Sequence, residues 1–389
     1  MEQQPHNVIL FGAGASCDAG IPLLGSFVDT MWNYAVRGKA GQQEISGADR
    51  DILFEANKIR EELERYNSRA YFDLRNLEDI LSLLSFEALN GSPHNEKYDK
   101  LVQAVARTIE LSCKHRYTPG VLAEPGPGSI YSEFWHEILN PELRAALPAI
   151  ITFNYDLVLE RTLWEYFHRR HGDAIGGHVH RCAIKYDLEP YDFIIDSVKH
   201  TFNNGNGYRP EFRWGNGAEV TIPYYKLHGS LNWDKGSQAR TLTGENVRPA
   251  QLPTAVVDQP LILPPVFNKM NSSALNGVWK SALTALRHAK NIVIVGYSLP
   301  KTDIYMQYFL KSAVGPNSDL QRIIVFDPVL FKEGPPCEEM KKRYRECFAP
   351  QFSDRIEFTP TSKYKHNAGK LIHFVRMLQQ EPGGLLFTP

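Results

Sequence analysis

The sequence predicts an α/β fold in which a doubly wound parallel sheet is covered by helices. The first observation behind this prediction is a series of short, continuous apolar runs, each bounded by glycine, proline or a polar residue. Such runs are typical of strands buried on both faces, although periodicity alone does not distinguish them from buried helix. The second observation is that helical periods separate these runs, which favours right-handed crossovers between parallel strands. The runs are Val8–Phe11, Ala149–Phe153, Asn291–Val295, Ile323–Phe326 and Ile356–Phe358.

The helical periods follow the strands in order. One begins after Pro22 and covers Phe27–Tyr34. A second covers Leu157–Phe167 and ends at Gly172 after a run of histidine and arginine, which suits the last turn of a helix. A third presents one apolar face ahead of the strand at Asn291. That face consists of Leu275, Val278, Trp279, Ala282, Leu283 and Leu286.

Two segments depart from the alternation of strand and helix. Between Asp49 and Cys113 the strand pattern disappears and three helical periods follow one another, so we expect a helical insertion over roughly 45–115. Residues 172–218 hold many Gly, Asn and His residues and few clear periods, which predicts a long loop or insertion.

The length of 389 residues corresponds to roughly two to three domains at about 150 residues each, but α/β cores of this size also occur as one unit. We expect one domain over residues 1–389, with a loose tail at 380–389.

Composition excludes several classes of function. There are 43 Lys and Arg residues against 44 Asp and Glu, a formal net charge of −1, so no overall field attracts nucleic acid or an acidic membrane. The N-terminus has no basic leader, and no apolar stretch reaches the about 18 residues of a membrane span. We therefore expect a cytoplasmic protein. The five cysteines include no C-x-x-C pair, which argues against a disulfide framework and a four-cysteine zinc site.

The first candidate site is the glycine-rich turn Gly12–Ser16, directly after the first apolar run. Glycines at this point allow a tight turn and let backbone N–H groups approach a pyrophosphate at the start of the next helix. Only two of the three glycines of G-x-G-x-x-G are present, because position 17 is Cys. An ordinary strand–helix turn is the alternative.

Two further candidates follow other strands. Asn154 comes directly after the second apolar run, and its amide offers a donor and an acceptor to a ribose hydroxyl or a water. Asp156 either faces the same ligand or only caps the next helix. His228 follows the run Val220–Tyr225 and precedes a glycine, a position suited to a general base. The alternative is a structural or merely solvated side chain, which is the more common state of any one of the 13 histidines.

The last candidates lie at the ends of two C-terminal strands. Gly296 permits close approach of a ligand, and Ser298 can bond to a ribose or a phosphate. Asp303 is expected to cap the helix that starts at Ile304. Asp327 sits where dinucleotide-binding folds place an acid on the adenosine ribose, with a simple turn before Pro328 as the equal alternative.

Taken in order, these motifs resemble the sirtuin superfamily, in particular the bacterial sirtuin-like proteins of antiviral defence. The resemblance covers roughly residues 7–330 and implies a Rossmann-like sheet, NAD as the substrate, and cleavage of the bond between nicotinamide and ribose. The motifs are GAGAS with GIP (12–16 and 20–22), TFNYD (152–156), KLHGS (226–230) and VGYSLPKTD (295–303).

The resemblance also implies a role for each matching residue. His228 corresponds to the catalytic histidine, which would take a proton from water or from a ribose hydroxyl. Asn154 would hold the ribose and order the attacking water, and Asp156 would contact the nicotinamide amide. Phe27 lies where the family has an aromatic residue beside the nicotinamide, although the motif arginine that follows it is absent. The remaining matches are Gly12, Ala13, Gly14 and Ser16 at the pyrophosphate and Gly296 and Ser298 at the phosphate and adenosine ribose.

Departures from the family pattern favour hydrolysis of NAD over protein deacylation. The cysteines of the zinc-binding small domain are absent, and about 70 residues separate Asn154 from His228, where deacylases have a shorter link. We therefore expect an NAD glycohydrolase without a metal site, acting as the toxic effector of an antiviral, abortive-infection system. The alternatives are an NAD-dependent protein deacylase and a non-catalytic NAD- or ADP-ribose-binding assembly subunit.

The resemblance implies partners as well. Related effectors are encoded beside a HerA-type DNA-translocating ATPase or another sensor, so a hetero-complex is expected. The apolar faces of the helical insertion predict a homo-oligomer. The alternative is that these helices only roof the nicotinamide pocket.

Overall fold

A computed structural model describes the fold for residues 5–66, 73–87, 94–114, 117–118, 121–122, 129–139, 147–169, 181–188, 192–202, 205–215, 218, 220–234, 248–249, 256–263, 275–332, 334–359 and 371–380. Nine strands form the main sheet in the order β16-β15-β14-β1-β6-β10-β7-β8-β9. The strands from β16 to β7 run parallel, and β8 and β9 are added antiparallel at one edge. Their bounds are β1 Asn7–Phe11, β6 Ala149–Thr152, β7 Arg181–Lys185, β8 Asp192–Phe202, β9 Gly205–Gly215, β10 Val220–Lys226, β14 Asn291–Val295, β15 Arg322–Phe326 and β16 Ile356–Thr359.

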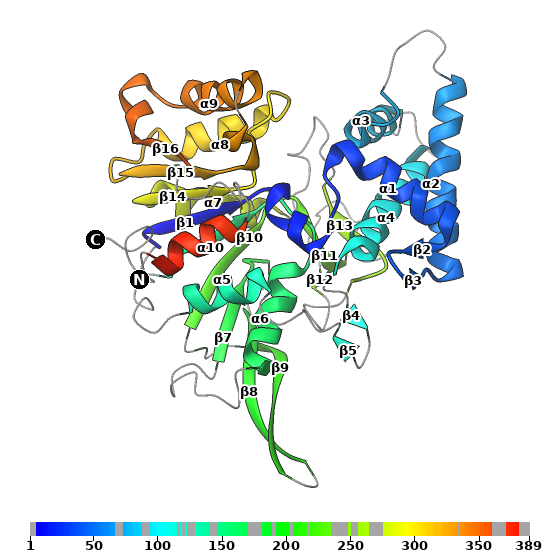
Figure 1. The fold of residues 1–389 in the computed structure, drawn as a ribbon, viewed down its shortest axis with the longest axis horizontal. Coiled ribbons are helices and arrows are strands. Elements are labelled where there is room, and N and C mark those ends of the chain that lie inside the picture. The colour runs from blue at the N-terminus through cyan, green and yellow to red at the C-terminus, as the bar shows by residue number, and fades with distance from the viewer. Residues whose placement is uncertain are drawn as a thin grey trace.

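Helices cover this sheet and also form a separate group beside it. Figure 1 shows α1 to α4 gathered beyond the carboxyl end of β1, whereas α5 to α10 lie along the sheet. The helices are α1 Leu24–Arg37, α2 Gly47–Tyr66, α3 Leu77–Glu87, α4 His94–Ser112, α5 Ile130–Ile138, α6 Val158–Arg169, α7 Asn276–Arg287, α8 Ile304–Val314, α9 Pro335–Cys347 and α10 Leu371–Gln380, with 3-10 helices η1 Ala13–Ala19, η6 Pro328–Phe331 and η7 Pro350–Arg355.

Three small sheets complete the fold. One joins β12, β11 and β13, and the other two are hairpins. Their strands are β2 Lys39–Ala40, β3 Gln43–Glu44, β4 Tyr117–Thr118, β5 Val121–Leu122, β11 Gly229–Asp234, β12 Arg248–Pro249 and β13 Pro260–Ile262.

The predicted doubly wound α/β class is confirmed. The five apolar runs are β1, β6, β14, β15 and β16, and every residue of β1, β6 and β14 is buried because helices pack on the sheet. The chain builds from β1 toward β6 and β10 on one side and from β14 toward β16 on the other. The direction of winding therefore changes between β1 and β14, and ligands of open α/β sheets bind at such a switch point.

The segment 172–218, expected to be a long loop or an insertion, contains the strands β7, β8 and β9, so the loop alternative is wrong for these three stretches. These strands contain Gly, Asn, Pro and charged residues, and β8 and β9 pair as a long antiparallel hairpin at the edge of the sheet. An edge hairpin requires no continuous apolar run, so the pattern that identified the central strands is missing. The expected tail at 380–389 lies outside the described residues, apart from Gln380.

The helix group has a hydrophobic core of its own. The three helices expected between Asp49 and Cys113 are α2, α3 and α4, and they pack with α1 around buried residues such as Phe27, Leu81 and Ile109. Leu157, Leu231 and Ile262, from the sheet side, join the same core. The helix group is thus packed against the carboxyl edge of the main sheet. The boundaries of the insertion as a domain stay a prediction.

A buried ion pair also ties the helix group to the sheet layer. Arg161 on α6 donates from Nη1 and Nη2 to the two carboxylate oxygens of Glu110 on α4, at 3.0 and 3.1 Å. The Arg161 side chain is 1% exposed and that of Glu110 is 16% exposed. The carboxylate of Glu110 favours the charged form of the guanidinium and raises the pKa of Arg161 against the opposing effect of burial.

Arg161→Met should lower the free energy of unfolding by about 3 kcal/mol, because it leaves Glu110 without its buried partner; the value lies at the low end of the usual range because water still reaches that carboxylate. Chemical denaturation measures the change. Lys58→Met, which removes an exposed pair with Glu55, is the control and should change stability by less than about 1 kcal/mol. Equal effects of the two substitutions would contradict the prediction.

None of the helices in the described ranges combines the length and the apolar character that crossing a bilayer requires.

Candidate active site at the carboxyl ends of the parallel strands

Four sequence motifs meet at one edge of the sheet because the strands that precede them are neighbours. β1 lies between β14 and β6, and β10 lies next to β6. The hydrogen bonds continue past the strand ends: Phe153 N donates to Phe11 O at 3.1 Å, and Leu227 N donates to Thr152 O at 3.0 Å. The segments that follow β1, β6, β10 and β14 are therefore held side by side.

The glycines after β1 and β14 pack against each other. Gly12 N donates to Val295 O and Gly14 N donates to Gly296 O, both at 2.9 Å. A Cβ at Gly12 would lie 2.5 Å from Gly296 O, and one at Gly296 would lie 2.3 Å from Ala15 N. The N–H groups of Gly12 and Gly14 are therefore both bonded within the protein. The assignment of Gly12, Ala13, Gly14 and Ser16 to a pyrophosphate stays a prediction. These glycines allow two turns of the protein's own main chain to touch.

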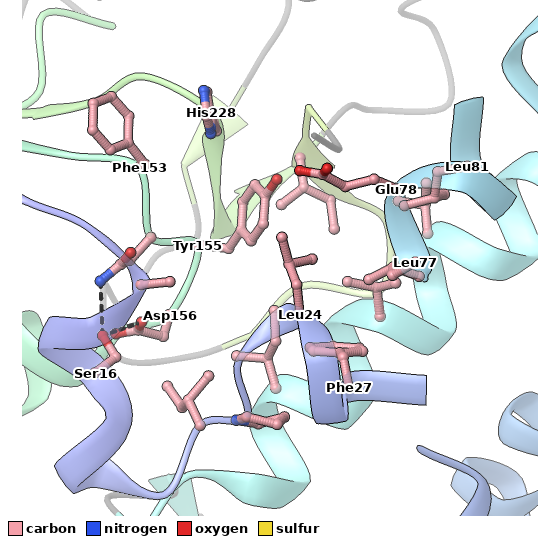
Figure 2. A pocket seen from close by; sticks show the side chains of 18 of the residues that line it. Ser16, Leu24, Phe27, Leu77, Glu78, Leu81, Phe153, Tyr155, Asp156 and His228 are labelled. Carbon is pink, nitrogen blue, oxygen red and sulfur yellow. Dashed lines mark hydrogen bonds between the residues drawn. The ribbon is translucent and has the colours of Figure 1, made fainter. Parts of the chain in front are cut away.

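Ser16 joins the first turn to the second motif. Asn154 Nδ2 donates to Ser16 Oγ at 2.8 Å and to Gly12 O at 3.0 Å, and Ser16 Oγ donates to Asp156 Oδ2 at 2.7 Å. Figure 2 shows the bonds at Ser16 as dashed lines. A main-chain carbonyl only accepts hydrogen bonds, so the amide nitrogen of Asn154 must face Gly12 O. Both amide hydrogens are then used, and Oδ1 is the atom that Asn154 can offer to a ligand.

Asp156 combines the two alternatives that the sequence left open. Its Oδ1 accepts from Val158 N at 3.1 Å, at the start of α6, while Oδ2 holds Ser16. The side chain is buried and also lines the pocket described next.

His228 lies between β10 and β11, and its side chain is 5% exposed. Its ring packs in tilted contacts with those of Phe153, at 5.3 Å between centroids, and of Tyr155 and Trp279, both at 6.3 Å. The following Gly229 has φ +87°, and a Cβ there would lie 2.1 Å from Leu261 O. The turn that carries His228 is therefore fixed by aromatic packing and by a close main-chain contact.

Asn154, Asp156 and His228 line one pocket between the sheet edge and the helix group. Figure 2 shows Phe27 and Leu24 from α1 and Leu77 and Leu81 from α3 facing the sheet-edge residues across it. Its cavity volume is about 180 Å³. An apolar cavity of about 150 Å³ holds a benzene ring, so an aromatic ring fits here. Ala13 and Ser16 also line it.

One acidic side chain enters the pocket from the helix group. Figure 2 shows the carboxylate of Glu78, on α3, directed toward Tyr155. Burial raises the pKa of the Tyr155 phenol, and the negative charge of Glu78 adds to this effect. The Tyr155 hydroxyl donates to Leu263 O at 2.6 Å. The pocket thus has an apolar wall, a neutral phenol and a carboxylate.

Gly296, Ser298 and Asp327 do not line this pocket. Ser298 O accepts from Arg343 Nη2 at 3.0 Å. Asp327 Oδ1 accepts from Val329 N at 2.8 Å and caps η6, which matches the turn alternative for this residue. Asp303 caps α8 as expected and also accepts from the Tyr297 hydroxyl at 2.8 Å.

Burial raises the pKa of the Asp327 carboxyl, although Arg343 and Lys332 oppose the shift. A carboxyl whose pKa is higher in the folded state costs stability as the pH rises above its unfolded pKa of about 3.9. Asp327→Asn keeps the acceptor for Val329 N and removes this cost. It should therefore gain stability relative to the parent at pH 7, and the gain should vanish at about pH 3.5, in denaturant titrations.

Asp327→Ala, which loses the cap, is the comparison and should be less stable than Asp327→Asn at both pH values. An Asn variant with the same stability difference from the parent at both pH values would contradict the role given to burial.

Several residues around the site were not predicted from the sequence. Glu78 belongs to a helix far from the motifs, and only tertiary packing brings it to the pocket. Lys226 and Glu160 form a buried ion pair beneath the second motif. A lysine at the end of an apolar strand was the available signal for that pair, since such a residue is almost never buried unless paired.

Within the described parts of the chain, no group of three or more His, Cys, Asp or Glu residues is placed to hold a metal ion.

No protein-family model matches this chain, and no curated protein matches it in sequence. Solved structures with some likeness include Sir2 bound to an acetylated peptide (12% identity, 98% of this chain and 94% of that chain, TM-score 0.39). A complex described as Sir2-p53 peptide-NAD+ gives 13% identity, 98% and 95% coverage, and a TM-score of 0.38. A mutant Sir2 homologue in complex with 2'-O-acetyl ADP ribose is 14% identical, with 97% of this chain and 95% of that chain covered and a TM-score of 0.40. At these identities and TM-scores the likeness carries no argument about activity.

Proposed function

We propose that this protein is an NAD glycohydrolase that cleaves NAD to nicotinamide and ADP-ribose. The observation that carries the proposal is the convergence of Asn154 and His228, from adjacent strand ends, on one apolar pocket of the size of an aromatic ring. A pocket with apolar walls and a few converging polar groups is the usual form of a small-molecule site.

The pocket suits the nicotinamide end of NAD. The nicotinamide ring of NAD is flat and cationic, so the apolar walls and the Glu78 carboxylate complement it in shape and charge. Asn154 and His228 lie at the edge of the same pocket, where the ribose would follow. The N–H groups of Gly12 and Gly14 are bonded within the protein, so the contacts of this turn with the pyrophosphate would come from Ala13 and Ser16, which line the pocket.

In the proposed reaction, the bond between the nicotinamide nitrogen and ribose C1′ breaks, and the electron pair leaves with nicotinamide. Asn154 Oδ1 accepts a hydrogen bond from the attacking water and holds it toward C1′. His228 takes the proton that this water releases, a contribution of about 10²–10⁴-fold for a well-placed base. The carboxylates of Asp156 and Glu78 stabilise the positive charge that develops on the ribose.

The test is incubation of the purified full-length protein with NAD alone, with chromatographic detection of nicotinamide and ADP-ribose. Cleavage without any peptide supports the proposal, and EDTA should leave the rate unchanged. Consumption of NAD only when an acetylated peptide is present would instead identify a deacylase. Binding of ADP-ribose without any turnover would identify an assembly subunit.

We further propose that cleavage serves as the toxic step of an antiviral defence system, in a homo-oligomer that a HerA-type ATPase or another sensor triggers. The motif resemblance and the neutral net charge support this role, since the charge suits a subunit that leaves DNA contact to a partner. Expression with and without the neighbouring gene, followed by measurement of cellular NAD, tests it. NAD that stays constant with both proteins present would argue against it.

A further inference from the structure

A lysine and a glutamate are completely buried directly beneath the proposed site. The side chains of Lys226, the last residue of β10, and Glu160, on α6, are both 0% exposed. Lys226 Nζ donates to Glu160 Oε1 at 2.9 Å. Ion pairs without any access to water are rare in proteins, because the cost of removing two charges from water is large.

Two further hydrogen bonds of this ammonium go to the main chain of the TFNYD segment. Lys226 Nζ donates to Asp156 O at 2.5 Å and to Tyr155 O at 3.4 Å. Tyr155 O also accepts from Leu231 N at 3.0 Å. The three donors of the ammonium are thus all used, and two of them hold the residues that directly follow Asn154.

Hydroxyl groups complete the surroundings of the glutamate. Tyr186 Oη donates to Glu160 Oε1 at 3.1 Å, and Tyr224 Oη lies 3.4 Å from Oε2. Burial, with Glu160 nearby, raises the pKa of both phenols, so they remain neutral donors. The glutamate is therefore satisfied by the lysine and two tyrosines.

We infer that Lys226 is a positioning residue for the cleavage reaction, an inference that rests on the proposed function. Lys226 lies two residues before His228 in the sequence. Its ammonium donates hydrogen bonds to the carbonyls of the two residues that follow Asn154. One side chain therefore sets the position of the segment bearing Asn154 relative to the segment bearing His228. Glu160 Oε1 accepts the third hydrogen bond of the ammonium and so fixes its position next to those carbonyls.

A role in stability alone does not account for this arrangement. Apolar residues of similar volume usually replace a buried ion pair without loss of stability. What they cannot supply is a donor directed at Tyr155 O and Asp156 O. Because a displacement of about 1 Å among reacting groups can cost about 10²-fold in rate, the expected loss lies in turnover.

The test is the double variant Lys226→Met with Glu160→Met, which removes both charges together. We expect a cooperative thermal transition, an affinity for ADP-ribose within about threefold of the parent, and a kcat about 10²-fold lower. Tyr186→Phe is the matched control, because it disturbs the same buried cluster but leaves the contacts of Lys226 with the two carbonyls. It should keep kcat within about threefold of the parent.

A folded double variant with a kcat within threefold of the parent would overturn the inference. Amide hydrogen exchange of the unmodified protein gives a second, independent measurement. If Lys226 holds the segment, the amides of Val158 and Leu231, which donate to Asp156 Oδ1 and Tyr155 O, should exchange as slowly as those of β6 and β10. Exchange at least 10²-fold faster than in those strands would overturn the inference even if the double variant failed to fold.

Failure of the proposed function is a separate outcome. A parent protein that leaves NAD intact would remove the proposed reaction. The hydrogen-exchange comparison would still test whether the segment is held as firmly as the inference requires, because it does not depend on turnover.

Discussion

Asn154→Ala should lower the rate of NAD cleavage by about 10²–10³-fold, to a few per cent of the parent or less, while the protein stays folded. The reason is the fixed orientation of the amide. Gly12 O and Ser16 Oγ take both hydrogens of Nδ2, so Oδ1 is held ready to accept from the attacking water. Alanine removes this acceptor and adds no competing group. His228→Ala should cause a loss of similar size, through removal of the base.

The structural cost of Asn154→Ala should be about 1–2 kcal/mol, since two hydrogen bonds of a half-buried side chain are lost. Asn317→Ala is a matched control. Asn317 likewise donates two bonds from Nδ2, here to the main-chain carbonyls of Leu286 and Ala289 at 2.9 and 2.8 Å, and its Oδ1 accepts from Asp319 N. The pocket does not include it. The Asn317→Ala variant should lose a comparable free energy of unfolding and keep full activity.

Initial rates of nicotinamide release and thermal unfolding of both variants measure these effects. Asn154→Ala with more than a tenth of the parental turnover would show that the amide does not order the water.

Gly296→Ala should lower the free energy of unfolding by more than about 3 kcal/mol and abolish activity. Gly296 has φ +67°, and a Cβ there would lie 2.3 Å from Ala15 N and 2.6 Å from the carbonyl carbon of Gly14. The clashing atoms are main-chain atoms of the turn after β1, so no flexible side chain could move to relieve the clash. The substitution must separate the turn after β14 from the turn after β1, and clashes of this kind belong to the most destabilising class of substitutions.

Gly41→Ala separates the clash from the backbone strain. Gly41 has φ +64°, almost the value at Gly296, but no atom lies within 4 Å of a Cβ placed there. It should cost about 1 kcal/mol, which is the strain of the left-handed conformation alone. Denaturant titrations of both variants give the comparison, and similar losses in the two would mean that the contact between the turns contributes nothing.

The central strands could be predicted from the sequence because burial on both faces leaves a continuous apolar run, as in Val8–Phe11. The polar residues at the strand ends could be predicted as neighbours for the same reason, since parallel strands bring their carboxyl ends to one edge. The structural role of the glycines could not be predicted in this way. A glycine shows that something approaches closely, but the sequence does not reveal whether that is a phosphate or the carbonyl of Gly296.

The contribution of the helix group to the pocket could not be predicted from the sequence either. Leu77 and Leu81 have the apolar period of any core-facing helix, so they give no sign that they also line a cavity. Glu78 lies between them on α3, and the sequence of this helix has the pattern of any amphipathic helix and contains none of the motifs. Its place opposite Tyr155 depends on how α3 packs against the sheet edge, which is a property of the tertiary fold.

The central place of β1 in the sheet has a consequence for synthesis on the ribosome. β1 is made first, yet its neighbour β14 lies 284 positions later, where Asn291 Nδ2 donates to Asn7 Oδ1 at 2.8 Å. The helix group, by contrast, draws most of its core from the contiguous stretch 27–111. Local contacts form early and distant pairings late. A nascent chain that already carries Asn154 and His228 therefore has no finished pocket until the segment around Tyr297 and Asp303 has emerged.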